Sequence, residues 1–71
     1  MSFYYSRLKD LREDRNKKLT QQEVADMLNT TQQTYSLWEN GTREIPFHHA
    51  ITLAKFYKVS LDYIAGLTNK K

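Results

Sequence analysis

Two helix-start signals lie close together in the middle of the chain, and they constrain its fold more than any other feature. Residues 20–23 (TQQE) form a capping box, in which the Thr hydroxyl and the Glu carboxylate each bind a free backbone N–H at the start of a helix. Thr31 is of a residue type that caps a following helix in the same way. Because only residues 29–30 separate the two segments, the pattern predicts short helices over 21–28 and 32–39 joined by a tight turn.

The rest of the chain contains three further helix patterns. Apolar residues recur at helical spacing over 3–15. Pro46 opens a fourth helix, because its fixed φ suits a first helical position, and Ser60 caps a fifth over 61–65 that ends at Gly66. We expect the fourth helix to bury five apolar residues: Phe47, Ala50, Leu53, Ala54 and Tyr57. No segment of useful length alternates with period two, so the sequence predicts an all-α, compact five-helix bundle.

Length and composition narrow the possible functions. A chain of 71 residues leaves room for one domain, 1–71, which we expect to have its core over about 3–66 and a flexible tail at 67–71. It has no cysteine, which excludes disulfides and thiolate metal sites, and we expect no metal and no cofactor. Two glycines leave no glycine-rich phosphate loop, so we do not expect an enzyme. There is no apolar run of about 18 residues and no signal peptide, so we expect a cytoplasmic protein with no membrane partner.

The net charge of +3 is distributed unevenly. Segment 19–41 contains no Lys or Arg and three acidic residues, so all 11 basic residues lie outside it. Its polar residues are mostly Gln and Thr, which suit hydrogen-bond recognition better than bulk electrostatic attraction. The charge therefore points only weakly to a polyanionic partner.

The helix predicted over 32–39 has two different faces. Helical spacing places Tyr35 and Trp38 together, and we expect both to pack in the core. Four of the other positions lie on or near the opposite face: Gln32, Gln33, Ser36 and Leu37.

Four spaced motifs in this chain resemble those of the phage repressor and Cro proteins, the XRE family of helix-turn-helix proteins. These motifs are TQQEVA at 20–25, TTQQTYS at 30–36, WENG at 38–41 and VSLDY at 59–63. The resemblance covers about 8–66. It implies that the second and third of five helices form the helix-turn-helix, with the third in the major groove of double-stranded DNA. The implied function is a DNA-binding transcription regulator, most simply a repressor that binds a palindromic operator as a homodimer.

The resemblance also implies roles for individual residues. Base-reading residues would be Gln32, Gln33, Ser36 and Leu37. Phosphate contacts would come from Gln21, Thr31, Thr34, Asn40, Thr42 and Arg43. A structural ion pair would join Arg12 and Glu39. Leu37 replaces a polar residue common at its position, and it either meets a thymine methyl or lies at an interface.

Other features leave alternatives open. Four apolar residues either form a dimer interface or belong to the core: Leu61, Tyr63, Ile64 and Leu67. Lys17 and Lys18 lengthen the segment before the second helix, and either reach the DNA backbone or extend a solvated turn. Adjacent histidines at 48–49 point about 100° apart on a helix, so they cannot chelate one ion together. The alternative function is an antitoxin-like or anti-regulator interaction module, whose partner would be a toxin or another regulator.

Overall fold

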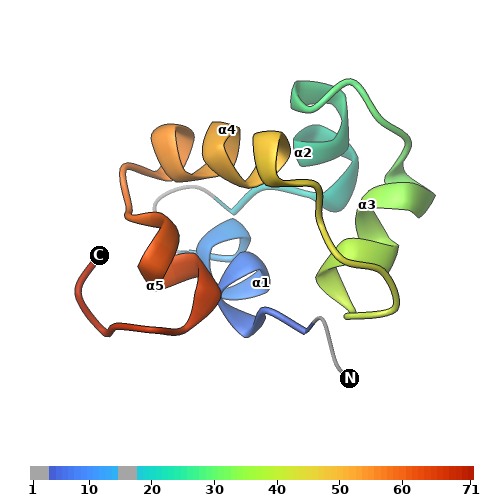
Figure 1. Cartoon of the computed structure of the whole chain (residues 1–71). Coiled ribbons are helices and arrows are strands. Elements are labelled where there is room, and N and C mark those ends of the chain that lie inside the picture. The colour runs from blue at the N-terminus through green and yellow to red at the C-terminus, as the bar shows by residue number, and fades with distance from the viewer. Residues whose placement is uncertain (1–3, 15–17) are drawn as a thin grey trace.

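The computed structural model describes residues 4–14 and 18–71, and within them the chain is all-α as predicted (Figure 1). There are five helices in these ranges: α1 (Ser6–Arg12), α2 (Gln21–Met27), α3 (Gln32–Glu39), α4 (Phe47–Tyr57) and α5 (Leu61–Ala65). The bounds of α3 and α5 agree with the prediction, while α2 ends one residue earlier and α1 is shorter than 3–15. Positions 1–3 and 15–17, which include Lys17, lie outside the described residues. No helix in the described ranges is long and apolar enough to cross a membrane.

Side-chain caps start three of these helices where the sequence predicted them. The hydroxyl of Thr20 accepts from the backbone N–H of Glu23 at 3.0 Å, and the Glu23 carboxylate accepts from the backbone N–H of Thr20 at 2.8 Å. Thr31 caps α3 by accepting from the backbone N–H of Thr34 at 3.1 Å. Ser60 caps α5 in the same way. These bonds satisfy N–H groups that have no partner within their helices.

The turn between α2 and α3 contains one residue in the left-handed backbone conformation, which ends α2. Asn29 has a φ of 58°, a conformation that Asn adopts more readily than most residues. The backbone N–H of Thr30 then reaches the carbonyl of Ala25 at 2.9 Å, and that of Asn29 reaches Asp26 at 3.2 Å. This pair of bonds closes the end of α2 and turns the chain directly into the cap of α3.

All five helices contribute to one apolar core. Tyr35 and Trp38 lie on the inner face of α3 as predicted, with their ring centroids 6.3 Å apart in an edge-on arrangement. Leu8, Val24 and Leu53 are fully buried around them. The outer face of α3 therefore belongs to a helix whose other side is anchored in the core.

The prediction that Phe47 is buried was wrong, because its side chain is 69% exposed. It is the first residue of α4, directly after Pro46, and Ile45 occupies the core beside this first turn with only 7% exposure. The remaining predicted residues of α4 are buried: Ala50, Leu53, Ala54 and Tyr57.

The end of the chain is attached to α1. The guanidinium of Arg7 donates through Nη1 to the carbonyls of Tyr63 and Thr68, both at 2.9 Å, and through Nη2 to Oδ1 of Asn69 at 2.8 Å. It also lies 4.1 Å from the centroid of the Tyr63 ring. Within the tail predicted to be flexible, Thr68 and Asn69 thus have specific partners.

Candidate DNA-recognition site

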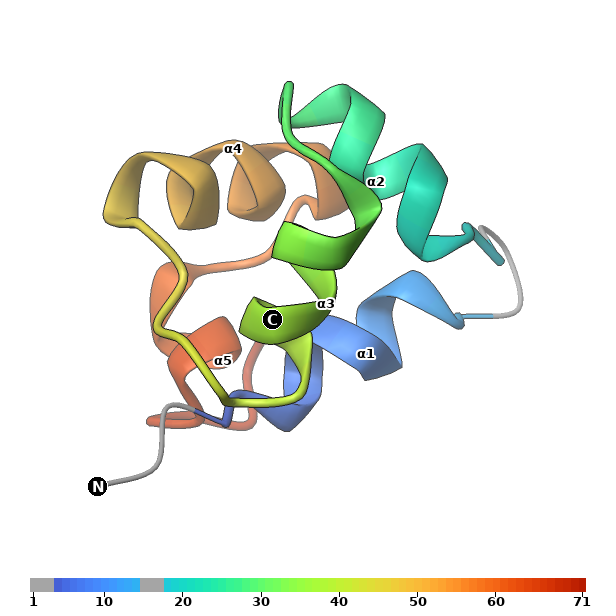
Figure 2. The ribbon, with the colours of Figure 1, turned by 90° about the vertical axis from the view of Figure 1, so that its right-hand side faces the viewer.

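Helices α2 and α3 pack against each other as a pair joined by the tight turn. In Figure 1, α3 lies at the edge of the molecule, and the turned view of Figure 2 shows that edge facing the viewer. Gln33 is exposed, and the other three candidate base readers are partly exposed: Gln32, Ser36 and Leu37. The structure therefore brings all four to the outer side of α3, where a duplex could meet them.

A chain of polar contacts links the start of α3 to the start of α2 and then to the core. The amide Nε2 of Gln32 donates to Oε1 of Gln21 at 2.6 Å. The Nε2 of Gln21 donates in turn to Oε1 of Glu39 at 3.1 Å. Arg12 closes the chain, donating through Nε to Oε2 and through Nη2 to Oε1 of Glu39 at 2.9 and 2.8 Å. The structural ion pair implied by the resemblance is present, and it is joined to the candidate reading residue through Gln21.

The ion pair is enclosed by the protein, because Arg12 is 9% exposed and Glu39 is 4% exposed. Burial on its own would raise the pKa of Glu39, but hydrogen bonds, above all those from Arg12, hold this pKa below its usual value. The pKa of Arg12 is raised by the same bonds. Glu39 is therefore a carboxylate at neutral pH, and it can only accept hydrogen bonds.

This fixed charge determines how both amides are oriented. Because Glu39 only accepts, Gln21 must direct its NH₂ group toward Glu39 and its carbonyl oxygen toward Gln32. Gln32 must then direct its own NH₂ group toward Gln21. What remains free on Gln32 is the carbonyl oxygen and one N–H, a neighbouring acceptor and donor.

The candidate phosphate-contacting side chains form two small polar clusters. At the start of α3, the hydroxyl of Thr31 donates to the hydroxyl of Thr34 at 2.9 Å, which leaves the Thr34 proton free to donate elsewhere. After α3, Oδ1 of Asn40 accepts from the backbone N–H and the hydroxyl of Thr42 at 3.0 and 2.7 Å, while the Asn40 NH₂ group has no partner among the residues described. Each cluster thus keeps a donor of the kind that binds phosphate oxygens.

Arg43 supplies the positive charge in this region. Its backbone N–H bonds to the carbonyl of Leu37 at 3.1 Å, which fixes the chain at the end of α3. Its side chain is exposed and makes no hydrogen bond or ion pair with the residues that the structure describes. Gln21, by contrast, uses both ends of its amide in the chain to Glu39, so a phosphate would have to share its NH₂ group.

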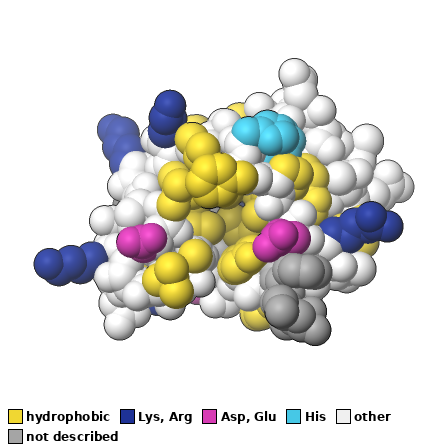
Figure 3. Space-filling view, viewed as in Figure 1, with side chains coloured by type: hydrophobic (Ala, Val, Ile, Leu, Met, Phe, Trp, Pro, Cys, Tyr) yellow, Lys and Arg dark blue, Asp and Glu magenta, His cyan; other side chains and the backbone are white. Residues whose placement is uncertain are grey.

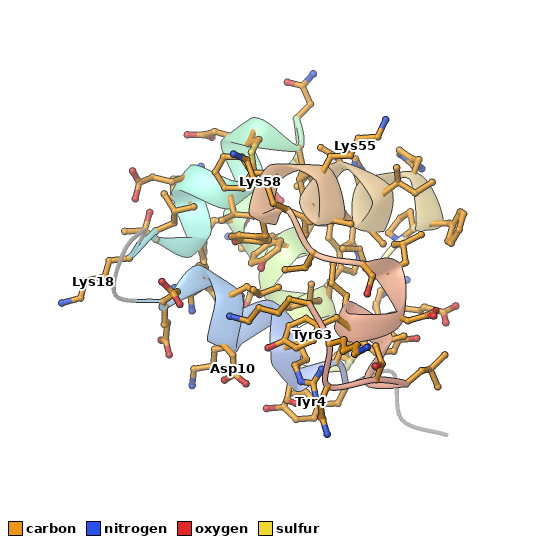
Figure 4. All side chains as sticks on the ribbon, turned by 90° about the vertical axis from the view of Figure 1, so that its left-hand side faces the viewer. Tyr4, Asp10, Lys18, Lys55, Lys58 and Tyr63 are labelled. Carbon is orange, nitrogen blue, oxygen red and sulfur yellow. The ribbon has the colours of Figure 1, made fainter. Side chains whose placement is uncertain are left out.

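Lys18 and the pair of histidines at 48–49 lie apart from the candidate phosphate-contacting residues in the sequence. Lys18 is exposed with a φ of 41°, and Figure 4 shows its side chain extending away from the molecule at the edge of that view. The ring of His49 packs on Trp38 with centroids 5.2 Å apart, and the His48 ring lies 4.0 Å from that of His49. Burial, and then the neighbouring His48, lower the pKa of His49. No group of three potential metal ligands exists among the residues described.

The residues predicted for a dimer interface occupy different environments. Ile64 is 3% exposed and belongs to the core, because α5 packs its inner face against α1 and α4, so assigning it to an interface was wrong. Tyr63 is half-buried under Arg7, and Leu61 is half-buried as well. Only Leu67, at 78% exposure, is free on the surface.

A groove of about 430 Å³ lies beside this region, between the start of α4 and α5. Its lining includes Leu61, Ala65, Pro46 and the exposed Phe47, with Glu44 and Asp62 as acidic residues. Figure 3 shows hydrophobic side chains gathered around a hollow on this face, with acidic groups beside it. The helical spacing of apolar residues did not predict Phe47 as part of this surface.

Two contacts of the site join distant segments, and no local pattern in the sequence predicts either of them. The hydroxyl of Tyr5 donates to Oε2 of Glu44 at 3.2 Å, across 39 positions in the sequence. Arg12 and Glu39 are 27 positions apart, and only the family resemblance suggested their pairing. The Gln21–Gln32 contact did have a local signal, since each residue is the first of one of two helices that a tight turn brings together.

Comparison with known proteins places this geometry in a family. Residues 8–64 match the helix-turn-helix family HTH_3. The chain is similar to two uncharacterized HTH-type transcriptional regulators of Bacillus subtilis (strain 168). It is 41% identical to YqaE over 58 residues, which cover 80% of this chain and 50% of that protein. It is 35% identical to YobD over 66 residues, which cover 93% of this chain and 57% of that protein.

The chain therefore spans a little over half the length, at most, of these curated relatives. The family match, however, includes all of α2 and α3 and most of the other helices. It confirms the resemblance carried by the four sequence motifs: the chain belongs to the helix-turn-helix family, of the phage repressor and Cro type.

Proposed function

We propose that this protein is a sequence-specific double-stranded DNA-binding transcription regulator that inserts α3 into the major groove. The observation that supports this most strongly is the amide chain from Gln32 through Gln21 to Glu39. It holds a candidate reading side chain in one orientation at the outer start of α3. A solvated surface glutamine would need no such support, and ordering it in advance lowers the entropic cost of a base contact.

The free groups on Gln32 define the base that it suits. Its carbonyl oxygen can accept from the N6 amino group of adenine, and its remaining N–H can donate to N7. A good bidentate pair of this kind contributes about 1 to 3 kcal/mol of discrimination. Gln33, Ser36 and Leu37 are the further candidate readers on the same side of α3.

Phosphate contacts would flank this reading face. Thr34 and Asn40 each keep a free donor, and Arg43 has an exposed, unpaired guanidinium among the described residues. We assign these residues, with Thr31 and Thr42 as their hydrogen-bonded supports, to orientation on the duplex. The absence of Lys and Arg from 19–41 implies few phosphate contacts and modest non-specific affinity.

The active form in this proposal is a homodimer that acts as a repressor on a palindromic operator. One recognition helix reads only a few base pairs, whereas two helices related by a two-fold axis read half-sites about 34 Å apart. The available contact surface is apolar and lies near α5: it comprises the exposed Phe47 and Leu67 and the half-buried Leu61.

The test is a selection from random duplexes of about 30 base pairs at near-physiological salt, followed by sequencing. The proposal expects an inverted repeat with half-site centres about one helical turn apart. Enrichment of a single unrepeated site would support sequence-specific DNA binding but contradict the homodimer. Failure to enrich any sequence would contradict the proposal and favour a protein partner, such as a toxin or another regulator.

A further inference from the structure

The loop between α3 and α4 carries an acidic residue directly beside its candidate phosphate-binding arginine. Arg43 and Glu44 are both exposed. A carboxylate at this position repels DNA phosphates, and it could also neutralise the arginine by pairing with it. Yet the part of the chain that the structure describes contains no ion pair between these two residues.

Glu44 is instead directed to the other side of the loop. Its Oε2 accepts the hydrogen bond from the hydroxyl of Tyr5 at 3.2 Å, and both residues line the groove beside α4 and α5. Arg43 is absent from that lining, and its backbone N–H is bound at the end of α3. The pKa of Tyr5 is raised by burial and then by Glu44, consistent with a hydroxyl held against a carboxylate.

The segment that carries Tyr5 is itself held against this loop. Gly41 has a φ of 84°, and a Cβ placed on it would lie 2.8 Å from Cβ and 2.9 Å from Cα of Tyr4. Only glycine permits so close an approach at this point. The contact between Gly41 and Tyr4 therefore fixes the chain before α1 beside the loop. The next residue, Tyr5, carries the hydroxyl that binds Glu44.

We propose that Tyr5 is a positioning residue for DNA binding, which holds the Glu44 carboxylate in the groove and away from Arg43 and the phosphates. The inference rests on the proposed function, because it concerns the phosphate-contacting loop of that same site. It concerns affinity for DNA of any sequence and does not involve base reading.

The experiment is a double-mutant cycle on the full chain with Tyr5→Phe, Glu44→Gln and the double variant. Dissociation constants are measured for the selected operator and for a scrambled duplex, at low and at high salt. We expect Tyr5→Phe to lower the affinity for both duplexes by about threefold at low salt, which is the size of a surface charge effect. The loss of affinity should be smaller at high salt. Glu44→Gln should raise the affinity for both duplexes. In the Glu44→Gln background, Tyr5→Phe should then leave the affinity unchanged.

The cycle separates this role from a purely structural one. If Tyr5→Phe weakened binding equally in both backgrounds, its hydroxyl would act without Glu44, and the inference would be overturned. Equal affinity of Tyr5→Phe and the wild type would overturn it as well, while leaving the proposed function intact. If the wild-type chain bound neither duplex, the proposed function would fail together with this inference. Circular dichroism and thermal unfolding of each variant confirm that the same fold is being compared.

Discussion

The amide nitrogen of Gln32 lies 2.6 Å from the Oε1 of Gln21, so the first residues of α3 and α2 hold each other in place across the helix-turn-helix. Because Gln21 also bonds to Glu39, the orientation of a residue on the proposed DNA-facing side depends on a buried charge in the domain. In the proposed function, one set of contacts thus serves both the stability of the fold and the geometry of recognition.

The Arg12–Glu39 pair should make the stability depend on pH in the acid range. The pKa of Glu39 is lower in the folded state than its usual 4.5, so its contribution is present above that value and is lost as pH falls through the lowered folded pKa. Glu39→Gln removes the buried partner of Arg12 and leaves it only the exposed carboxylate of Glu13, 3.5 Å from Nη2. This change should cost about 3 kcal/mol of unfolding free energy at pH 7. Urea unfolding at several pH values checks both points. A Glu39→Gln variant with the same acid dependence as the wild type would contradict this assignment.

Removal of the Tyr57 hydroxyl should be tolerated. The ring is in the core, and its hydroxyl is buried with no hydrogen-bond partner among the residues described. Burial raises the pKa of Tyr57 to about 12, as expected for a hydroxyl removed from water. Tyr57→Phe should therefore keep the unfolding free energy or raise it by about 1 kcal/mol, measured by urea unfolding. A loss of stability of this size would instead show that the hydroxyl has a partner in solution.

The exposed apolar residues around α5 should determine self-association, whereas the inner face of α5 determines folding. Ile64→Asp places a charge in the core and should unfold the domain. Leu67→Asp and Phe47→Asp change exposed side chains and should keep the fold while weakening the homodimer. Thermal unfolding and sedimentation velocity distinguish these outcomes. If both surface variants sedimented like the wild type, the dimer contact would have to lie elsewhere.

Arg43 should contribute to binding without contributing to specificity. Arg43→Ala should weaken operator and scrambled duplexes alike and reduce the slope of log affinity against log salt by about 0.9, the value for one phosphate. Lys55→Ala is the matched control, because Lys55 is exposed on α4 and Figure 4 shows it pointing away from the molecule. A loss of affinity at the operator alone would assign Arg43 to base reading.

The wild-type chain should make few phosphate contacts. A slope of log affinity against log salt far steeper than about −6 would contradict this.

The fold could be predicted from the sequence where local chemistry decides the structure. The caps at Thr20, Thr31 and Ser60 act within one turn of their own helices, and they placed the starts of α2, α3 and α5. The apolar spacing of Tyr35 and Trp38 likewise identified the inner face of α3.

The rest depended on contacts between distant segments. Phe47 and Ile64 are both large apolar residues, and only the packing around each decides that one is exposed and the other buried. The position of Glu44 depends on Tyr5, 39 positions away, and no local pattern links the two. For the candidate site, the motifs supplied the candidate reading residues, but they could not reveal the amide chain that orients Gln32.

The measurement that tests the central claim most directly is the affinity of Gln32→Ala for the selected operator and for a scrambled duplex, with Gln22→Ala as control. Gln22 is an exposed glutamine of α2 that bonds to Asp26 and takes no part in the chain to Glu39. If α3 reads bases through Gln32, Gln32→Ala should lose about 1 to 3 kcal/mol at the operator, keep its affinity for the scrambled duplex, and relax one base position. Gln22→Ala should bind both duplexes like the wild type. If Gln32→Ala lost affinity equally for both duplexes, or lost affinity for neither, the account would be contradicted.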